Sequence, residues 1–337
     1  MENKKTKKTT MEDIANKLKI SSTTVWRVVN NKKGVSPETE RKVKKLLEKY
    51  FYSKNLIASS LRKNSTKTIG VVFSDIENPF YAFALNGIEE VCLQNNYNLM
   101  FSLNHENYQL ERQAIEFLWE KRIDGLILVP VDGSENNLDI IEKLGLQTVF
   151  MARYIKRFGG NRVTLDDFHA GYIATSFLLD KGHKLIVHLA GPHGTSSTYD
   201  RLGGYKKALA DRKIKYDPSF VVFGNSMKIH GKNNTLSLFK KRKDISAIFA
   251  YSDFVSYGVL EALEQLRLNV PENVAVIGCD DNDISSSMGL TTISSPKKDM
   301  GKLAAKILIK KLKNIDKDPD SIEVRICKPK LVIRKTV

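Results

Sequence analysis

From residue 67 onward, short apolar runs alternate with segments long enough for helices, and this alternation constrains the fold most strongly. The runs are rich in Val, Ile and Leu, as strands buried on both faces are. Strands that alternate with helices of ten or more residues predict parallel sheets covered by helices on both faces. The clearest runs are KTIGVVFSD (67–75), NLMFSLN (98–104), DGLILVPV (124–131), QTVFMAR (147–153), KLIVHLAG (184–191), SFVVFG (219–224), SAIFAYS (246–252) and VAVIGCD (274–280). Two later segments, GLTTISSP (289–296) and VRICKPKLVIR (324–334), break the alternation and are expected to be crossover segments.

Residues 10 to 50 have a different pattern, which predicts three short helices. The first, TMEDIANKL, has apolar residues at helical spacing, and Thr10 with Asp13 resembles a capping box. The second, SSTTVWRVVN, follows after a tight turn with Ser21 as a candidate cap. The third begins with Ser36 as a cap and Pro37 at the first helical position. A second helix so close behind the first predicts helix-turn-helix geometry. The residues expected to be buried are Met11, Ile14, Ala15, Leu18, Val25, Val28, Val29, Val43, Leu46, Leu47 and Tyr50.

The positive charge is concentrated in the first fifth of the chain. Residues 1–68 hold 18 Lys and Arg against 6 Asp and Glu, a net charge of +12, whereas the whole chain carries +16. A compact basic segment attached to a nearly neutral body is typical of a nucleic-acid-binding module. A solvated basic tail gives the same composition, so the helical pattern has to decide between the two.

Several classes of protein are disfavoured by what the sequence lacks. The N-terminal segment has no apolar core of a signal peptide, and no apolar run approaches the roughly 20 residues of a membrane span, so we expect a cytoplasmic protein. The three cysteines are scattered, as core residues in a reducing compartment are. Dinucleotide, P-loop, esterase and zinc-protease signatures are missing, and His183, His188 and His193 do not have zinc-ligand spacing. We therefore predict no enzyme, no cofactor and no metal.

Several segments, taken in order, resemble the lactose-repressor (LacI/GalR) family of bacterial transcription regulators. The likeness runs from Thr10 to Arg334. It is carried by MEDIANKLKISSTTVWRVVN, VSPETERKV, IASSLR, KTIGVVFSDIENPFYA, RIDGLILVP, LLDKGHKLIVHLAGP, DRLGGYKKAL, NVPENVAVIGCDDND and LTTISSPKKDMGKLA. The resemblance implies a helix-turn-helix headpiece, a hinge helix, and an α/β core of two doubly wound parallel-sheet subdomains like those of periplasmic binding proteins.

The resemblance implies the domain boundaries. We expect the headpiece with its basic arm over 1–54, the hinge over 55–66 and an effector-binding and dimerisation core over 67–337. Within the core, one subdomain would take about 67–163 plus 291–322, and the other about 164–290 plus 323–337.

The second helix of such a headpiece lies in the major groove and reads bases near its N-terminus. By this resemblance Ser22, Thr23 and Arg27 would contact bases, and Arg can hold guanine with two hydrogen bonds. Ser21 and Thr24 would donate to phosphate, unless Ser21 is only a cap and Thr24 only a surface residue.

Trp26 departs from the family, which usually has serine at this position. It would either lie along the DNA backbone with its indole N–H on a phosphate or pack as additional core.

The hinge carries a second DNA signal. In the family a leucine of the hinge helix enters the minor groove, and the matching residue is Leu61, flanked by Ala58 and Arg62. Lys54 replaces the proline that commonly precedes this segment. Without the resemblance, Leu61 would be an ordinary linker residue.

Loops at the carboxyl ends of strands are the expected ligand site of such a core. From the resemblance, aromatic residues of the first loop would stack on the ligand, and an Arg and an Asp of later loops would bind its polar groups. Phe80 and Tyr81 are alternatively core residues at a helix start. The candidates are Asp75, Phe80, Tyr81, Arg201 and Asp280, with Arg153, Met227 and Asp253 as weaker ones.

The function implied is repression of a carbohydrate-use operon. A homodimer would bind a pseudo-palindromic double-stranded DNA operator, and a small effector, expected to be a sugar, would bind between the subdomains and change operator affinity. The alternative is a cytosolic sugar-binding or sugar-processing protein with a vestigial headpiece.

Overall fold

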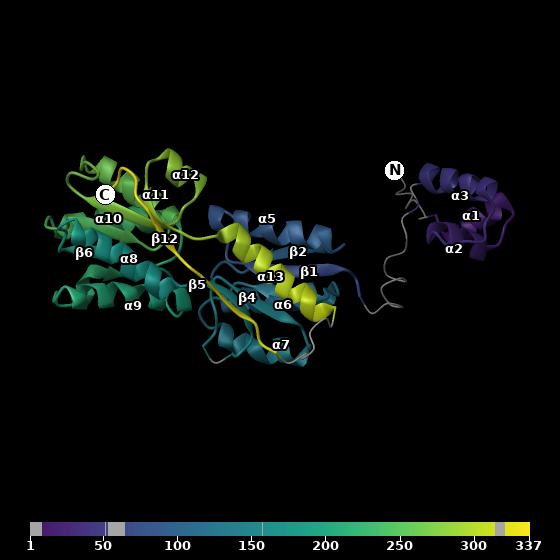
Figure 1. The fold of residues 1–337 in the computed structure, drawn as a ribbon, viewed down its shortest axis with the longest axis horizontal. Helices are drawn as coiled ribbons and strands as arrows, with labels where there is room; N and C mark the ends of the chain where they lie inside the picture. The colour runs from purple at the N-terminus through teal and green to yellow at the C-terminus, as the bar shows by residue number, and fades with distance from the viewer. Residues whose placement is uncertain (1–8, 51, 53–64, 157, 314–320) are drawn as a thin grey trace, which may run out of the picture. The chain divides into compact units, whose positions relative to one another are not determined.

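The computed structural model describes residues 9–50, 52, 65–156, 158–313 and 321–337. The chain divides into two compact units, Met1–Thr66 and Lys67–Val337. They are the headpiece and the core, and Figure 1 draws their helices and strands.

The headpiece is built from three helices that begin where their capping residues predict. They are α1 (Met11–Leu18), α2 (Ser22–Val29) and α3 (Pro37–Lys49). Thr10 and Asp13 form the predicted capping box at the start of α1. The side chains of Ser21 and Ser36 accept hydrogen bonds from the backbone N–H groups of Thr24 and Thr39, which fixes the starts of α2 and α3.

Five buried residues hold the three helices together. The core consists of Ile14, Ala15, Val25, Val28 and Val43. Tyr50 is an exception to the predicted buried stripe, because it ends α3 and its hydroxyl accepts a hydrogen bond from Lys17 at 3.0 Å. The second of three helices, α2, therefore keeps one face in the core and leaves the other free.

The core unit contains two sheets, as the resemblance predicts, and each has six strands in the described residues. The first sheet has β1 (Thr68–Phe73), β2 (Asn98–Leu103), β3 (Gly125–Leu128), β4 (Thr148–Met151), β5 (Asn161–Leu165) and β11 (Val324–Cys327). The second has β6 (Ile186–Leu189), β7 (Val221–Val222), β8 (Ala247–Ala250), β9 (Ala275–Asp280), β10 (Thr291–Ser294) and β12 (Lys330–Val332).

The two sheets share one topology. Their orders are β11-β5-β4-β3-β1-β2 and β12-β10-β9-β8-β6-β7. All paired strands run parallel except β12, which is antiparallel to β10. Each position in the first sheet has its counterpart in the second, with β1 and β2 matching β6 and β7. Each half of the core is therefore a doubly wound α/β unit.

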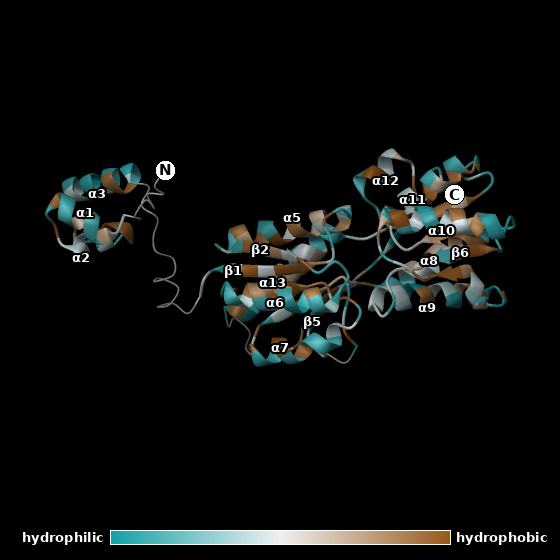
Figure 2. Ribbon diagram, turned by 180° about the vertical axis from the view of Figure 1, so that it is seen from behind, coloured by the Kyte–Doolittle hydropathy of each residue, from teal (hydrophilic) through white to brown (hydrophobic). Residues whose placement is uncertain are grey.

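Helices cover both faces of each sheet. In the first half, α5 (Pro79–Gln94) and α13 (Lys297–Leu312) bury one face, and α6 (Tyr108–Glu120) and α7 (Leu138–Lys143) bury the other. In the second half, α8 (Asp167–Asp180) and α9 (Ser196–Asp211) lie opposite α10 (Lys228–Lys241) and α11 (Asp253–Gln265). The strands are mostly brown in Figure 2, whereas the helices alternate brown and teal. The remaining short helices are η1 (Ser134–Asn137), η2 (Pro218–Phe220) and α12 (Asp283–Ser287).

The strand pairings correct the predicted subdomain boundaries. β5 extends the first half to residue 165 instead of 163, and β10 pairs with β9, so residues 291–294 belong to the second half. β11 pairs with β5, so residues 324–327 belong to the first half. The boundaries at 290/291 and 322/323 are therefore wrong, because an apolar strand carries no mark of the sheet it joins.

Candidate functional site

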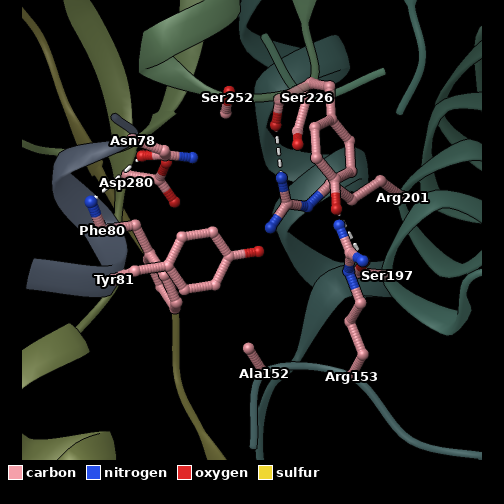
Figure 3. Close-up of a pocket in the computed structure, with 11 residues that line it drawn as sticks. Asn78, Phe80, Tyr81, Ala152, Arg153, Ser197, Arg201, Ser226, Ser252 and Asp280 are labelled. Carbon is pink, nitrogen blue, oxygen red and sulfur yellow. Dashed lines mark hydrogen bonds between the residues drawn. The ribbon is translucent and has the colours of Figure 1, made fainter. Parts of the chain in front are cut away.

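A small pocket lies between the two halves of the core, where strands of both sheets end. Its volume is about 40 Å³, which is room for about three water molecules. Figure 3 shows Phe80, Tyr81 and Asp280 on one side of it, and Arg153 and Arg201 on the other. The lining residues are Asn78, Phe80, Tyr81, Ala152, Arg153, Ser197, Arg201, Ser226, Tyr251, Ser252 and Asp280.

The aromatic wall is carried by the first turn of α5. Asn78 caps this helix by accepting a hydrogen bond from the backbone N–H of Phe80 at 3.0 Å. The ring of Tyr81 stacks on Phe73 at 5.3 Å and meets Phe80 edge to face. Both rings line the pocket and belong to the buried core, so the two readings of Phe80 and Tyr81 are compatible.

Asp75 supports this wall from behind and does not line the pocket. Its Oδ1 accepts a hydrogen bond from the backbone N–H of Asn78 at 2.8 Å. Its buried Oδ2 has no hydrogen-bond partner among the residues that the structure describes. Burial raises the pKa of this carboxyl, although the bond from Asn78 opposes the shift.

Arg153 is held at the end of β4 by Glu106. Its guanidinium donates to both carboxylate oxygens, at 2.8 and 2.9 Å, in a bidentate pair. Burial acts to raise the pKa of Glu106, but Arg153 outweighs it, and the pKa lies below its ordinary value. The hydroxyl of Ser226, from the second half, donates to Glu106 at 3.3 Å. This ion pair therefore also joins the two halves.

Arg201 is also buried and lies in the second half. Its Nε donates to Asp167 at 2.8 Å, its Nη1 donates to the carbonyl oxygen of Tyr251, and its guanidinium lies 4.6 Å from the Tyr251 ring centre. Gly171 on α8 allows the backbone of α9 to pack closely at Arg201, since a Cβ there would lie 2.1 Å from the Arg201 carbonyl oxygen. Ser197, one turn before Arg201 on α9, exchanges a hydrogen bond with the Tyr251 hydroxyl at 2.8 Å.

Asp280 ends β9 in a strained backbone conformation, with φ of 138°. Burial raises the pKa of its carboxyl to about 8, and the neighbouring Asp253 adds to the shift. Asp280 therefore holds a proton near neutral pH and offers a hydrogen-bond donor to the pocket.

Asp253 and Met227 do not line the pocket. The Asp253 carboxylate accepts hydrogen bonds from the backbone of Asn282 and from the hydroxyls of Ser285 and Thr292, so it ties α11 to β10 and α12. Met227 only precedes α10, and the preceding residue Ser226 lines the pocket instead.

The sequence did not single out six lining residues. They are Asn78, Ala152, Ser197, Ser226, Tyr251 and Ser252. Each lies one to four residues from a predicted site residue. The expectation that ligands bind at the carboxyl ends of strands therefore finds the right loops, but it does not say which side chains of a loop line the pocket.

The exposed face of α2 is the candidate nucleic-acid interface. Ser22, Thr23 and Arg27 are exposed, as base contacts require. The hydroxyls of Ser21 and Thr24 bond to each other at 2.8 Å, which supports the capping role of Ser21. The hinge residues Ala58, Leu61 and Arg62 lie outside the described residues.

Trp26 is partly buried on the flank of α2. It does not belong to the apolar residues that pack against the headpiece core in the described part of the chain. Its position therefore agrees better with a surface role than with additional core, and its contact with DNA stays a prediction.

Within the described ranges, no three His, Cys, Asp or Glu side chains are grouped to hold a metal ion. Nor is any helix among them long and apolar enough to cross a membrane. His188 is buried against Phe249, where burial lowers its pKa to about 4.

Comparison with known proteins identifies both parts of the chain. The family of bacterial regulatory proteins called lacI matches residues 10–55, and a periplasmic binding protein-like domain matches residues 175–337. The fold and the cleft thus define a helix-turn-helix regulator with a periplasmic-binding-protein-like core.

Whole-chain relatives give the family. A ribose operon repressor of Haemophilus influenzae is 31% identical over 97% of this chain and 98% of its own length. The HTH-type transcriptional repressor PurR of Photobacterium profundum is also 31% identical, over the same shares of the two chains. The chain belongs to the LacI family of bacterial transcription regulators.

Solved structures agree on the fold. The lac repressor dimer bound to operator and an anti-inducer superposes with a TM-score of 0.84 at 23% identity, covering 98% of this chain and 99% of that one. A LacI family regulator from Enterococcus faecium with bound ribose has a TM-score of 0.70 at 23% identity, covering 80% of this chain and 98% of that one.

Proposed function

We propose that this protein represses a carbohydrate-use operon and that a small sugar in the cleft changes its affinity for the operator. The observation that carries the proposal is a pocket lined by both halves of the core in a chain with a helix-turn-helix headpiece. A ligand held by both halves favours one arrangement of them, and it changes DNA affinity if the operator favours one arrangement too. Relatives named as repressors of a ribose operon and of PurR type support this reading.

The charge balance of the cleft favours an uncharged effector. Arg153 is paired with Glu106, and Arg201 with Asp167, so neither guanidinium is left to neutralise a phosphate. The hydroxyls of Ser197 and Ser252 and the faces of Phe80 and Tyr81 suit a hydroxyl-rich ring. The ribose-bound neighbour supports a neutral monosaccharide.

The pocket is too small for a sugar ring as it stands, because it has room for only about three water molecules. We therefore infer that the two halves move apart when the effector enters. The hydrogen bond from Ser226 to Glu106 crosses between them, and it breaks in this step.

Calorimetric titration of the full chain tests the effector class. We expect D-ribose or another neutral pentose or hexose to bind, and D-ribose 5-phosphate to give no heat. Tight binding of the phosphate ester together with no response to neutral sugars contradicts the proposal.

A binding titration with DNA from the protein's own upstream region tests the regulator. Arg27→Ala is expected to weaken binding about 5- to 150-fold, because the bidentate contact of an arginine contributes roughly 1–3 kcal/mol. Leu61→Ala should also weaken it, by loss of the minor-groove wedge. Lys143→Ala, on the core surface, is the control. No specific binding by the wild type favours the vestigial-headpiece alternative. Specific binding that survives Arg27→Ala and Leu61→Ala contradicts the roles proposed for these two residues.

Salt dependence separates backbone from base contacts. Affinity for operator DNA is expected to fall steeply as salt rises, since Lys and Arg side chains displace cations from phosphates. Trp26→Ser should lower this affinity if the indole binds a phosphate, and only the thermal stability if it belongs to the core. A flat salt profile contradicts the electrostatic part of the proposal.

We further propose a homodimer that acts in the cytoplasm, where operator DNA lies, and that has no enzymatic activity. Large apolar side chains stay exposed on α5, at Leu93, and on α12 and its C-cap, at Ile284 and Met288. Figures 1 and 2 place α5 and α12 along the same edge of the core. Sedimentation of the full chain should therefore give twice the monomer mass, and a monomer contradicts this part of the proposal.

A further inference from the structure

A second cavity lies beside the candidate effector pocket, on the other side of α9. Its volume is about 350 Å³, almost nine times that of the pocket with Arg201. Ser197 and Arg201 lie on one face of α9 and line the smaller pocket, whereas Tyr199 lines the larger cavity. Two residues along a helix turn by about 200°, so Tyr199 points away from the smaller pocket. The two spaces are therefore separate.

Both halves of the core build the larger cavity. Pro130, Val131 and Ile155 come from the first half, and the start of α9 comes from the second. Two hydrogen bonds join the halves at this point. The backbone N–H of Tyr154 donates to the Ser196 hydroxyl at 2.9 Å, and the Tyr154 hydroxyl donates to Asp200 at 3.0 Å.

Tyr154 and Tyr199 line this cavity with their hydroxyls already engaged, and the Arg162 guanidinium lies over the Tyr154 ring, 4.6 Å from its centre. Tyr154 donates to Asp200, and the Tyr199 hydroxyl shares a 2.8 Å hydrogen bond with His193. The Thr195 hydroxyl donates to the Pro192 carbonyl oxygen at 3.1 Å. A sugar would therefore find few free partners here, in contrast to the smaller pocket.

The charges at the cavity are balanced. Glu135 and Lys156 are its two charged lining residues in the described chain, and both are exposed. With one charge of each sign and walls of mixed polarity, the cavity favours a ligand without net charge. Flat rings pack well on tyrosine faces.

We propose that this cavity is a second ligand site, which takes an uncharged molecule with a flat aromatic or heteroaromatic ring. Such a ligand contacts both halves and stabilises the arrangement in which they are joined. By linkage it changes the affinity of the effector pocket without entering it. The site does not depend on the identity of the sugar or of the operator.

The probe for this site is 5-fluoroindole, followed by fluorine NMR on the full chain. We expect saturable binding to the wild type and a rise in its melting temperature. Tyr199→Ala should weaken binding at least five-fold, and Glu135→Trp, at the exposed rim, should abolish it by filling the entrance. The matched control is Phe117→Ala, which removes an aromatic ring of similar exposure on α6, outside both pockets.

Several results would overturn the proposal. They are the absence of saturable binding to the wild type, equal binding by Tyr199→Ala and the folded Glu135→Trp variant, and a loss caused by Phe80→Ala instead. The last result would place the probe in the effector pocket. Because neither DNA nor sugar is present, failure here leaves the proposed repressor function standing.

Discussion

The two halves of the core share a topology but hold their buried charges differently. In the first half, Arg153 meets Glu106 in a complete bidentate pair, and the Glu106 side chain keeps 18% of its surface exposed. In the second half, Arg201 faces an excess of acid, with Asp167 against it and Asp253 and Asp280 nearby. One fold can therefore contain both a balanced ion pair and a buried cluster with an excess of acid. We expect the pH dependence of stability to arise mainly from the second half.

The largest effect is expected from Arg201→Met. The variant leaves Asp167 buried without its partner, and loss of one member of a buried pair costs roughly 3–5 kcal/mol. Urea unfolding measures the change in the free energy of unfolding. Arg112→Met, which breaks an exposed pair with Asp139, is the control and should cost less than about 1 kcal/mol. A similar small loss for Arg201→Met would show that the second half is not strained by its acids.

Asp280 should make stability depend on pH. The folded protein keeps the Asp280 proton up to pH about 8, whereas an unperturbed carboxyl loses it near 3.8. Between these values the folded state holds one proton more, so stability falls as pH rises. Asp280→Asn removes this contribution. Melting temperatures at pH 5.5 and 8 should fall less for the variant than for the wild type, and parallel curves would contradict the raised pKa.

Arg153→Met should be milder than Arg201→Met. Glu106 is partly exposed, so water can solvate its carboxylate when the arginine is gone, and we expect a loss of about 1–3 kcal/mol. The same urea experiment measures it. Equal losses for the two variants would remove the distinction between the halves.

The smallest effect is expected from Ser226→Ala. The variant removes one 3.3 Å hydrogen bond between the halves, worth about 0.5–1.5 kcal/mol. Since this bond must break for a sugar to enter, the variant should lose stability and gain effector affinity. Ser237→Ala, an exposed serine on α10, is the control. An unchanged sugar affinity would argue against the opening step.

The sequence predicted the element types and the headpiece caps because both depend on neighbouring residues. Thr10, Ser21 and Ser36 act within three residues of their own position, and the helices begin where these residues place them. The sheet assignment of β10 and β11 depends on contacts with residues far away in the chain, which local patterns do not record. The boundaries drawn from the resemblance failed there.

The candidate site was predicted in part for a related reason. Arg201 and Asp280 line the pocket, as predicted for loops after the carboxyl ends of strands. Asp253 also follows a strand, but its carboxylate accepts hydrogen bonds from Ser285 and Thr292 and does not line the pocket. The direction of a side chain at a helix start depends on which donors surround it. That information exists only once β9, β10 and α12 have packed.

The crossing from β11 to β12 has a consequence for synthesis. Residues 324–327 complete the first sheet and residues 330–332 complete the second, so both sheets lack an outer strand until this stretch leaves the ribosome. The headpiece needs only residues up to about 50 and can fold far earlier, while translation continues. A nascent chain therefore contains a folded DNA-binding unit before its effector-binding core is complete. Recognition of DNA becomes possible during translation earlier than its control by an effector.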